Sequence, residues 1–389
     1  MSAYVRNKIS FFIIFFLLQV QSYAQFGFDK IDDDPLSLYN IVEWWSRPIY
    51  NRVEGVVPHL GFIFNPKPSW AFSVVSQVSY GTKSDNWRYK VGLEKRFFDT
   101  NRLIARMETF DETYSNDFWL IGKIENSIAG LLLREDFCDY YRRKGWRIFA
   151  DQKFFRHHLI RLTFSQYRNL DMTTRSNFAG SLLGDGKKFR PNPPVIEGFE
   201  NSINLSLYVD TRDNPFIPNA GVFLTVFLEK TFGDFNTQGI FVDGRLYMPT
   251  WGNQRLVCRQ MIGVRRGDEI PQYSLHLGGI GSMRAYPDRC RAGRYFALFR
   301  TYYLCGGDFF KSLTGRYLSF MEATSLGFFF ELGDAWTPER VSVFSNIELL
   351  ADAGVSLLLL DGLFRIDLAW KIDKTDNGWR LTCRLFDHI

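Results

Sequence analysis

The sequence predicts an all-β fold, a transmembrane antiparallel β-barrel of about 16 strands with one helix-bearing loop insertion. Three observations predict it: an export signal at the N-terminus, segments that alternate apolar and polar residues, and an aromatic content of 17%. A barrel alternates lipid-facing and lumen-facing side chains and gathers aromatic residues at the two membrane interfaces. The mean hydropathy of −0.16 argues against a helical membrane protein.

The export signal comes first in the chain. Arg6 and Lys8 precede an apolar run from Ile9 to Val20, and Ser22-Tyr23-Ala24 matches a small-x-small cleavage site. The apolar run is about a dozen residues long, whereas a spanning helix needs about 20, so we expect cleavage and not anchoring. We therefore expect a signal peptide (1–24), an N-terminal periplasmic segment (25–52) and a transmembrane β-barrel (53–389) in the outer membrane of a Gram-negative cell.

Alternation with a period of two is clearest between residues 203 and 210. One face of this segment carries Ile203, Leu205, Leu207 and Val209, and the other carries Asn204, Ser206, Tyr208 and Asp210. Similar patterns occur at 240–248 and 364–372. A soluble β-sandwich would also alternate, but about fifteen or sixteen such segments without a dividing linker favour one barrel.

One segment breaks this pattern. From about residue 118 to 141, Ile121, Ile124, Ile128, Leu131 and Leu132 recur at intervals of three and four, which predicts a helix in a loop outside the strands. Gly145 is its expected C-terminal stop, and the basic residues at 142–144 are interpreted as a helix end or an interfacial anchor. A plug, a partner-docking element and an ordinary loop helix all remain open.

Composition and motifs indicate no enzyme, cofactor or nucleic-acid partner. The five cysteines show no CxxC spacing, and the net charge of +5 includes no long basic run. Ser282 lies in Gly-Ile-Gly-Ser-Met, which lacks the second glycine of the Gly-x-Ser-x-Gly elbow. The histidines show neither nucleophile nor metal spacing. We expect no catalytic residue and no metal site.

The most specific motif is Leu-Gly-Gly-Ile-Gly-Ser-Met-Arg-Ala-Tyr at 277–286. It resembles the Gly-Gly followed by Val/Ile-Arg-Gly-Tyr/Phe signature of the BamA/TamA superfamily of outer-membrane assembly factors, the bacterial surface antigen family. The resemblance implies an extracellular loop that folds back into the barrel, with its arginine against an aromatic and an acidic residue of a neighbouring strand. The loop motif would then comprise Gly278, Gly279, Arg284 and Tyr286.

The partner strand is similar to the family pattern Phe-x-Asp-x-Gly, here Phe329, Glu331 and Gly333. Phe329 and Glu331 are two residues apart, so they share one face of a strand. A buried arginine needs such a carboxylate, because an unpaired buried charge costs several kcal/mol. Two departures from the family are Ala285 in place of glycine and Glu331 in place of aspartate.

A third stretch resembles a hairpin of the same family. It runs from Asp210 to Gly221, and its motif residues are Asp210, Arg212, Asp213, Pro218 and Gly221. Residues 353–355 and 362–368 resemble the family's penultimate strands. The resemblance covers roughly the whole mature chain.

What the resemblance implies is a role in outer-membrane protein insertion or translocation, alone or as a subunit of a larger complex. About thirty residues separate Gln25 from the expected first strand, too few for a POTRA domain of about 75 residues, so we expect a form lacking POTRA domains. The expected partners are outer-membrane lipid (lipopolysaccharide and phospholipid) and a POTRA-bearing barrel or lipoproteins. The alternative is a passive channel or structural barrel plugged by the inward-folded loop.

Overall fold

A computed structural model describes residues 42–65, 72–97, 103–155, 157–178, 187–215, 217–252, 254–306, 324–337, 348–360, 362–372 and 378–385. The expected signal peptide lies outside these residues, as does the N-terminal segment as far as residue 41. Contact clustering divides the chain into two units. Unit 1 takes the described residues up to Phe118 with Lys123–Asp151 and Thr163–Asn201, and unit 2 takes Trp119–Gly122, Gln152–Leu162 and the residues from Ser202 onward.

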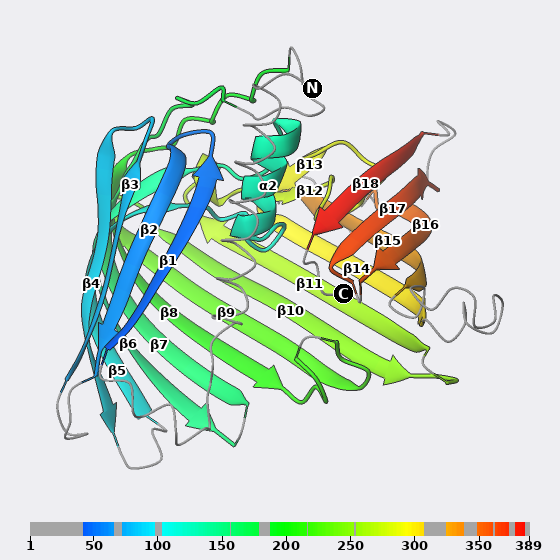
Figure 1. Ribbon diagram of the computed structural model, residues 1–389, viewed down its shortest axis with the longest axis horizontal. Helices are drawn as coiled ribbons and strands as arrows, with labels where there is room; N and C mark the ends of the chain where they lie inside the picture. The colour runs from blue at the N-terminus through cyan, green and yellow to red at the C-terminus, as the bar shows by residue number, and fades with distance from the viewer. Residues whose placement is uncertain are drawn as a thin grey trace, which may run out of the picture. The chain divides into compact units, whose positions relative to one another are not determined.

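The architecture is a 16-stranded sheet in which each strand pairs with the next one along the chain, except that β11 pairs with β14 (Figure 1). The intervening strands β12 and β13 form a separate two-stranded sheet. The pairings described are antiparallel. The strands are β1 (Val42–Asn51), β2 (Gly55–Phe64), β3 (Ser73–Gly81), β4 (Asn86–Phe97), β5 (Leu103–Tyr114), β6 (Tyr141–Phe154), β7 (His158–Leu170), β8 (Gly198–Asp210), β9 (Gly221–Gly233), β10 (Thr237–Pro249), β11 (Arg255–Gly267), β12 (Leu275–Leu277), β13 (Arg291–Gly293), β14 (Tyr295–Cys305), β15 (Ser325–Trp336), β16 (Leu350–Leu359), β17 (Phe364–Lys371) and β18 (Trp379–Leu385). The all-β class and the 16-stranded antiparallel sheet predicted from the sequence are confirmed.

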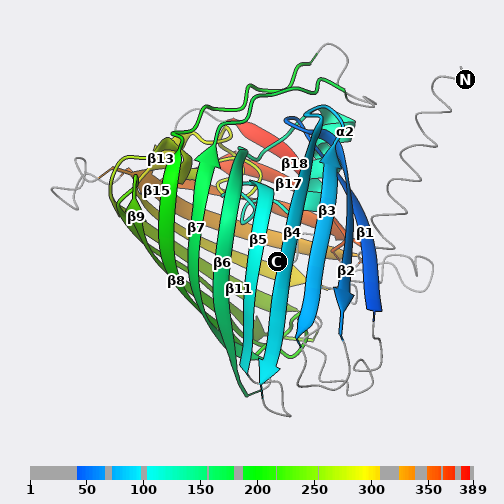
Figure 2. The same ribbon diagram turned by 90° about the vertical axis from the view of Figure 1, so that its left-hand side faces the viewer.

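The alternation of side chains is inverted relative to a water-soluble sheet. Along β4, Trp87 and Leu93 are 65% and 53% exposed, whereas Arg88 and Glu94 are 5% and 3% exposed. Figure 2 shows β4 between β3 and β5. In β8, Ile203 and Leu205 are exposed while Ser202 and Ser206 are buried. A sheet that exposes its apolar face and covers its charged face suits lipid on the first and a polar interior on the second.

The predicted helix is present but shorter than expected. Helix α2 spans Lys123–Leu133, and residues 116–120 form turns. Gly145 is not its stop, because this residue lies inside β6, where a Cβ would come within 2.0 Å of the Gln166 carbonyl oxygen. The basic residues 142–144 also belong to β6, and Arg142 pairs with Asp111 there. No helix in the described ranges is long and apolar enough to cross a membrane.

The sheet begins earlier than the expected boundary at residue 53. β1 occupies Val42–Asn51 and pairs with β2 along its whole length. The sequence concealed this strand because Trp44 and Trp45 are adjacent and Pro48 interrupts the pattern, so the period of two is lost. The segment expected to precede the barrel therefore contributes its first strand.

Candidate functional site

The site is centred on the loop between β11 and β14 in unit 2, which begins and ends with the paired strands β12 and β13. Gly278 and Gly279 adopt φ of +108° and +90°, a region that L side chains rarely adopt. A Cβ on Gly278 would also lie 2.4 Å from the Pro287 carbonyl oxygen. The Ser282 hydroxyl accepts the N–H of Gly278 at 3.1 Å, so this serine closes the turn.

Arg284, at the tip of this loop, is fully buried against the polar face of the sheet. Its Nη2 lies 3.6 Å from Glu331 Oε1 on β15, and its Nη1 lies 3.3 Å from Asp367 Oδ2 on β17. The guanidinium also lies over the rings of Phe329 and Tyr302, at 4.3 and 4.9 Å from their centroids. Two carboxylates and two aromatic faces therefore surround one cation, which compensates for its loss of water.

The same strands bind the backbone of the loop. The Arg284 N–H donates to Glu331 Oε2 at 3.0 Å, and the next N–H, that of Ala285, donates to Asp352 Oδ2 at 2.8 Å. Glu331 on β15 is the register partner of Asp352 on β16, which sets the two carboxylates side by side. Two carboxyl groups on neighbouring strands therefore fix two consecutive peptide groups of the loop in place.

Arginines on the strands bind the carbonyl groups of the loop. Arg300 on β14 donates to the Gly281 carbonyl at 2.9 Å, and Arg384 on β18 donates to the Ile280 carbonyl at 2.9 Å. Arg384 also donates to the Leu120 carbonyl, at 3.1 Å. Gly281 is required here, since a Cβ would lie 2.6–2.8 Å from atoms of Leu120. The loop is therefore held through its donors and its acceptors alike.

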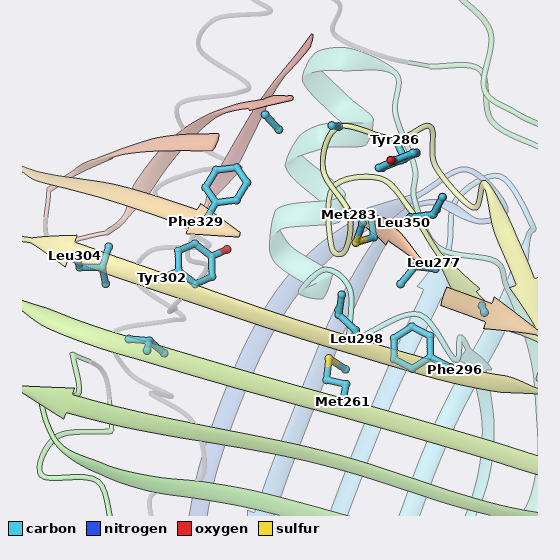
Figure 3. Close-up of a cluster of buried hydrophobic side chains, with 14 of the residues drawn as sticks. Met261, Leu277, Met283, Tyr286, Phe296, Leu298, Tyr302, Leu304, Phe329 and Leu350 are labelled. Atoms are coloured by element: carbon cyan, nitrogen blue, oxygen red, sulfur yellow. The ribbon is translucent and has the colours of Figure 1, made fainter. Parts of the chain in front are cut away.

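An apolar cluster lies beside these charges. Figure 3 shows Leu277 and Met283 of the loop near Leu298 and Phe296 of β14. Leu277 and Met283 are both fully buried. Burying such side chains removes apolar area from water, which adds a stabilisation of about 1.5–3 kcal/mol for each. Charge pairing and apolar packing act on the same loop.

The structure accommodates both departures from the family motif. Ala285 is not among the residues with positive φ, so a Cβ is tolerated where the family carries glycine. Glu331 is fully buried, and it reaches both the side chain and the N–H of Arg284.

Two glycines allow close packing around the partner strand. Gly354 leaves space for the Phe329 ring, because a Cβ there would lie 2.4 Å from the ring edge. Gly333, also on the partner strand, would meet the Ala297 carbonyl at 2.6 Å if it carried a Cβ.

The hairpin motif lies between β8 and β9, and its contacts are local. Arg212 Nη2 lies 2.7 Å from Asp210 Oδ2, and the guanidinium covers the Phe223 ring at 4.7 Å. Asp213 Oδ1 accepts the backbone N–H groups of Asn214, Asn219 and Ala220 at 2.9–3.2 Å. Burial opposes the effect of these hydrogen bonds, but together they lower the pKa of Asp213 below its ordinary value.

Pro218 is buried in this hairpin, and Gly221 has a φ of +118°. A Cβ on Gly221 would lie 2.5 Å from the Thr211 carbonyl oxygen, so the turn requires glycine. The structure therefore brings together the loop motif and the partner strand. The hairpin motif forms a separate rigid turn.

Sequence reasoning missed four members of the site: Asp352, Arg300, Tyr302 and Arg384. Asp367 was noted only as part of a family-like strand. Each lies on the buried face of a strand, in the register that faces the loop. The available signal was alternation itself, since Arg365 and Asp367 occupy every second position of an otherwise apolar β17.

A second buried arginine, Arg52, was also missed, and it lies in the β1–β2 turn of unit 1. It is fully buried, and its Nη1 lies 3.2 Å from Asp136 Oδ1. Its Nη2 lies 2.9 Å from Asp139 Oδ1 and 3.1 Å from Asn192 Oδ1. The Arg52 carbonyl accepts the N–H groups of residues 175 and 176. Residues 136–139, 175–176 and 192, which are far apart in the sequence, therefore meet at this turn.

The side chains at these two sites pair buried charges. Within the described residues no group of three or more His, Cys, Asp or Glu side chains could hold a metal ion. In the loop beside Arg52, burial followed by the neighbouring Asp117 and Asp136 carboxylates raises the pKa of the Cys138 thiol well above its ordinary value. A protonated, fully covered thiol is a poor nucleophile.

The chain is similar to one family of unknown function and to solved outer-membrane barrels. The model of a family of unknown function, DUF5686 C-terminal domain, matches residues 35–215. No curated protein matches the chain. Among solved structures, BamA from Haemophilus ducreyi lacking POTRA domains 1–3 aligns with a TM-score of 0.59 and 11% identity, over 89% of this chain and 70% of that one. The chain has the fold of a BamA-type β-barrel.

Two further structures are CdiB from Acinetobacter baumannii and CdiB from Escherichia coli, each at 11% identity. Their TM-scores are 0.43 and 0.42, and they align over 88% and 89% of this chain. The chain spans 58% and 62% of their lengths, which is less than two thirds. The BamA likeness shows the fold alone, and it confirms the predicted class, a transmembrane antiparallel β-barrel.

Proposed function

We propose that this chain is an outer-membrane barrel that takes part in the insertion or translocation of outer-membrane proteins in a Gram-negative cell. One observation carries the proposal. In a fold similar to that of BamA, the loop resembling the family signature places Arg284 against Glu331 and Phe329, the partners that the resemblance implies. A loop fixed in this way gives the polar face of the sheet a defined shape.

The proposed mechanism uses the ends of the sheet. β1 and β18 are the first and last strands in the sheet order. A terminal strand offers N–H and C=O groups to which an extended client segment can add as a further strand. We assign the chain no catalytic role, because Ser282 is fully buried and its hydroxyl accepts the Gly278 N–H.

The proposed partners are membrane lipid and a second assembly component. Exposed apolar side chains such as Trp87, Leu93 and Phe328 support contact with lipopolysaccharide and phospholipid. A POTRA-bearing barrel or lipoproteins would bring clients to the barrel.

Affinity purification of the tagged chain from outer membranes, followed by mass spectrometry, tests the proposal. We expect recovery of a POTRA-bearing barrel, lipoproteins or periplasmic chaperones above the level obtained with an equally tagged unrelated barrel. Isolation of the chain by itself, together with unchanged amounts of folded outer-membrane proteins after its depletion, would contradict the proposal.

The alternative is a passive channel or structural barrel plugged by the loop, and the complete burial of Leu277, Met283 and Arg284 favours it. Single-channel conductance separates the two functions. A plug predicts a several-fold rise for Arg284→Ala, with no rise for Arg291→Ala at the foot of the loop, where the arginine pairs with the exposed Glu348. Unchanged conductance in Arg284→Ala counts against the channel.

A further inference from the structure

The direction of the backbone groups of β1 follows from its neighbour β2. Val56 is the register partner of Tyr50. Val56 donates its N–H to Thr82 Oγ1 and accepts the Thr82 N–H, both at 3.1 Å, so its backbone groups point away from β1. Tyr50 and Val56 are therefore a non-hydrogen-bonded pair, and the Tyr50 N–H points to the outer edge of β1. By the same alternation, the backbone groups of residues 48, 46, 44 and 42 point outward too.

Helix α2 covers the first of these outward positions. The Tyr50 N–H donates to Ser127 Oγ at 2.9 Å, and Ser127 donates its own proton to the Lys123 carbonyl at 2.7 Å. The helix approaches closely because Gly130 faces the Tyr50 ring, where a Cβ would lie 3.0 Å from a ring carbon. Figure 1 shows α2 beside β1. The backbone donor of Tyr50 is thus occupied by a side chain of the protein itself.

The next outward position has no donor. Pro48 carries no N–H, and proline on an edge strand prevents a further strand from pairing there. Its register partner on β2 is Pro58. The outer edge of β1 is therefore closed to strand pairing from residue 48 to its C-terminal end by two independent features.

The remaining part of this edge carries an apolar neighbour. Beside this part of β1 lie Leu60, Phe62 and Phe64 of β2, which are 52%, 45% and 39% exposed. These three side chains share one face of the sheet, because they are two residues apart along the strand. A strand added beside residues 42–46 would continue this exposed apolar face if its own residues alternate apolar and polar.

We propose that the outer edge of β1 accepts an extended strand of alternating apolar and polar residues only along Val42–Ser46, and that Ser127 of α2 together with Pro48 excludes this strand from Pro48–Asn51. The inference rests on the proposed function, in which β1 receives a client segment. It adds the register of that pairing and the device that limits it.

Disulfide capture of a defined probe tests the inference. The probe is a synthetic peptide with the sequence of β18, Trp-Arg-Leu-Thr-Cys-Arg-Leu. The full chain, with its five native cysteines replaced by serine and reconstituted in phospholipid vesicles, carries a single new cysteine as Ser46→Cys or Tyr50→Cys, two positions on the same face of β1. We expect at least tenfold more adduct at position 46 than at position 50.

Two further backgrounds identify the cause. Pro48→Val with Ser127→Ala should raise the adduct at position 50 to the level at position 46, whereas Ser127→Thr, which keeps a hydroxyl acceptor, should leave it low. Heat modifiability on gels verifies that each variant is folded. Equal capture at both positions in the original background, or no gain at position 50 in the double variant, would overturn the exclusion.

Absence of adduct at position 46 would overturn the binding edge itself. Co-purification judges the proposed function separately. If assembly partners are recovered while the peptide is not captured, the inference fails and the function stands. If the peptide is captured at both positions equally, the edge accepts a strand and only the restriction by α2 and Pro48 fails.

Discussion

Arg284 in unit 2 and Arg52 in unit 1 are both fully buried, but their surroundings differ. Arg284 extends from a loop to carboxylates carried by strands, Glu331 on β15 and Asp367 on β17. Arg52 extends from a β-turn to groups carried by loops, among them Asp136 and the carbonyls of Asp136 and Cys138. In unit 2 the strands carry the carboxylates that hold the loop residue Arg284. In unit 1 the β1–β2 turn carries Arg52, which holds the loop groups.

The difference indicates which residue each region depends on. Glu331 binds Arg284 and Arg300 together, so it is the shared partner of two buried cations. In unit 1 the shared group is Arg52, because Asp136 keeps hydrogen bonds from Asn126 and Tyr140, and Asp139 keeps its ion pair with Arg190. In each region, removal of the shared group should therefore cost the most stability. The shared group is the acid Glu331 in unit 2 and the base Arg52 in unit 1.

The largest effect is expected for Glu331→Ala, which leaves Arg284 and Arg300 without their common carboxylate. Breaking a buried ion pair costs about 3–5 kcal/mol. Because two cations lose their partner here, the expected loss in the free energy of unfolding is about 5 kcal/mol. Tryptophan fluorescence during urea unfolding from phospholipid vesicles measures the free energy of unfolding. Glu331→Asp keeps the carboxylate and should lose no more than about 1.5 kcal/mol. Equal losses in the two variants would show that Glu331 is not the shared partner.

A smaller effect, about 3 kcal/mol, is expected for Arg52→Met, because its acidic partners keep other donors. The backbone N–H groups of residues 175 and 176, which donate to the Arg52 carbonyl, should exchange faster with deuterium as the turn loosens. Hydrogen–deuterium exchange with mass spectrometry measures this change. Arg175→Met is the matched control, since Arg175 is exposed in one of the same loops. If amide exchange accelerates equally in that control, Arg52 is not the group that holds the turn.

The smallest effect is expected at the exposed hairpin, where a carboxylate binds three backbone N–H groups instead of a buried cation. Because the folded state lowers the pKa of Asp213, its contribution is complete above the ordinary aspartate pKa of about 3.9 and is lost as the pH falls through the lowered value. The amide chemical shifts of Asn219 and Ala220 should follow this titration. Asp213→Asn should abolish it, and a midpoint at or above the ordinary value would contradict the predicted direction.

The sequence predicted most of the strands because alternation is a local property. Every second residue is apolar from Ile203 to Val209 in β8 and from Phe364 to Trp370 in β17, and both strands form as expected. The prediction failed where local signals conflicted: Pro48 and adjacent tryptophans concealed β1, and helical spacing extended the expected helix towards Gly145, which belongs to β6. In both cases the pairing of the segment with a neighbouring strand determines its structure. The sequence of a single segment does not show with which strand it pairs.

By itself, the sequence determined the fold class and the residues of the loop motif, since alternation and short motifs are written in neighbouring positions. Only the tertiary structure decided which charges meet. Asp352 lies beside Glu331 because of the β15–β16 register, and Arg52 meets Asp136 across 84 residues of chain. It also decided that Ser127 covers the Tyr50 N–H. These pairings depend on strand register and on loops that return from distant positions, and no local pattern in the sequence encodes either.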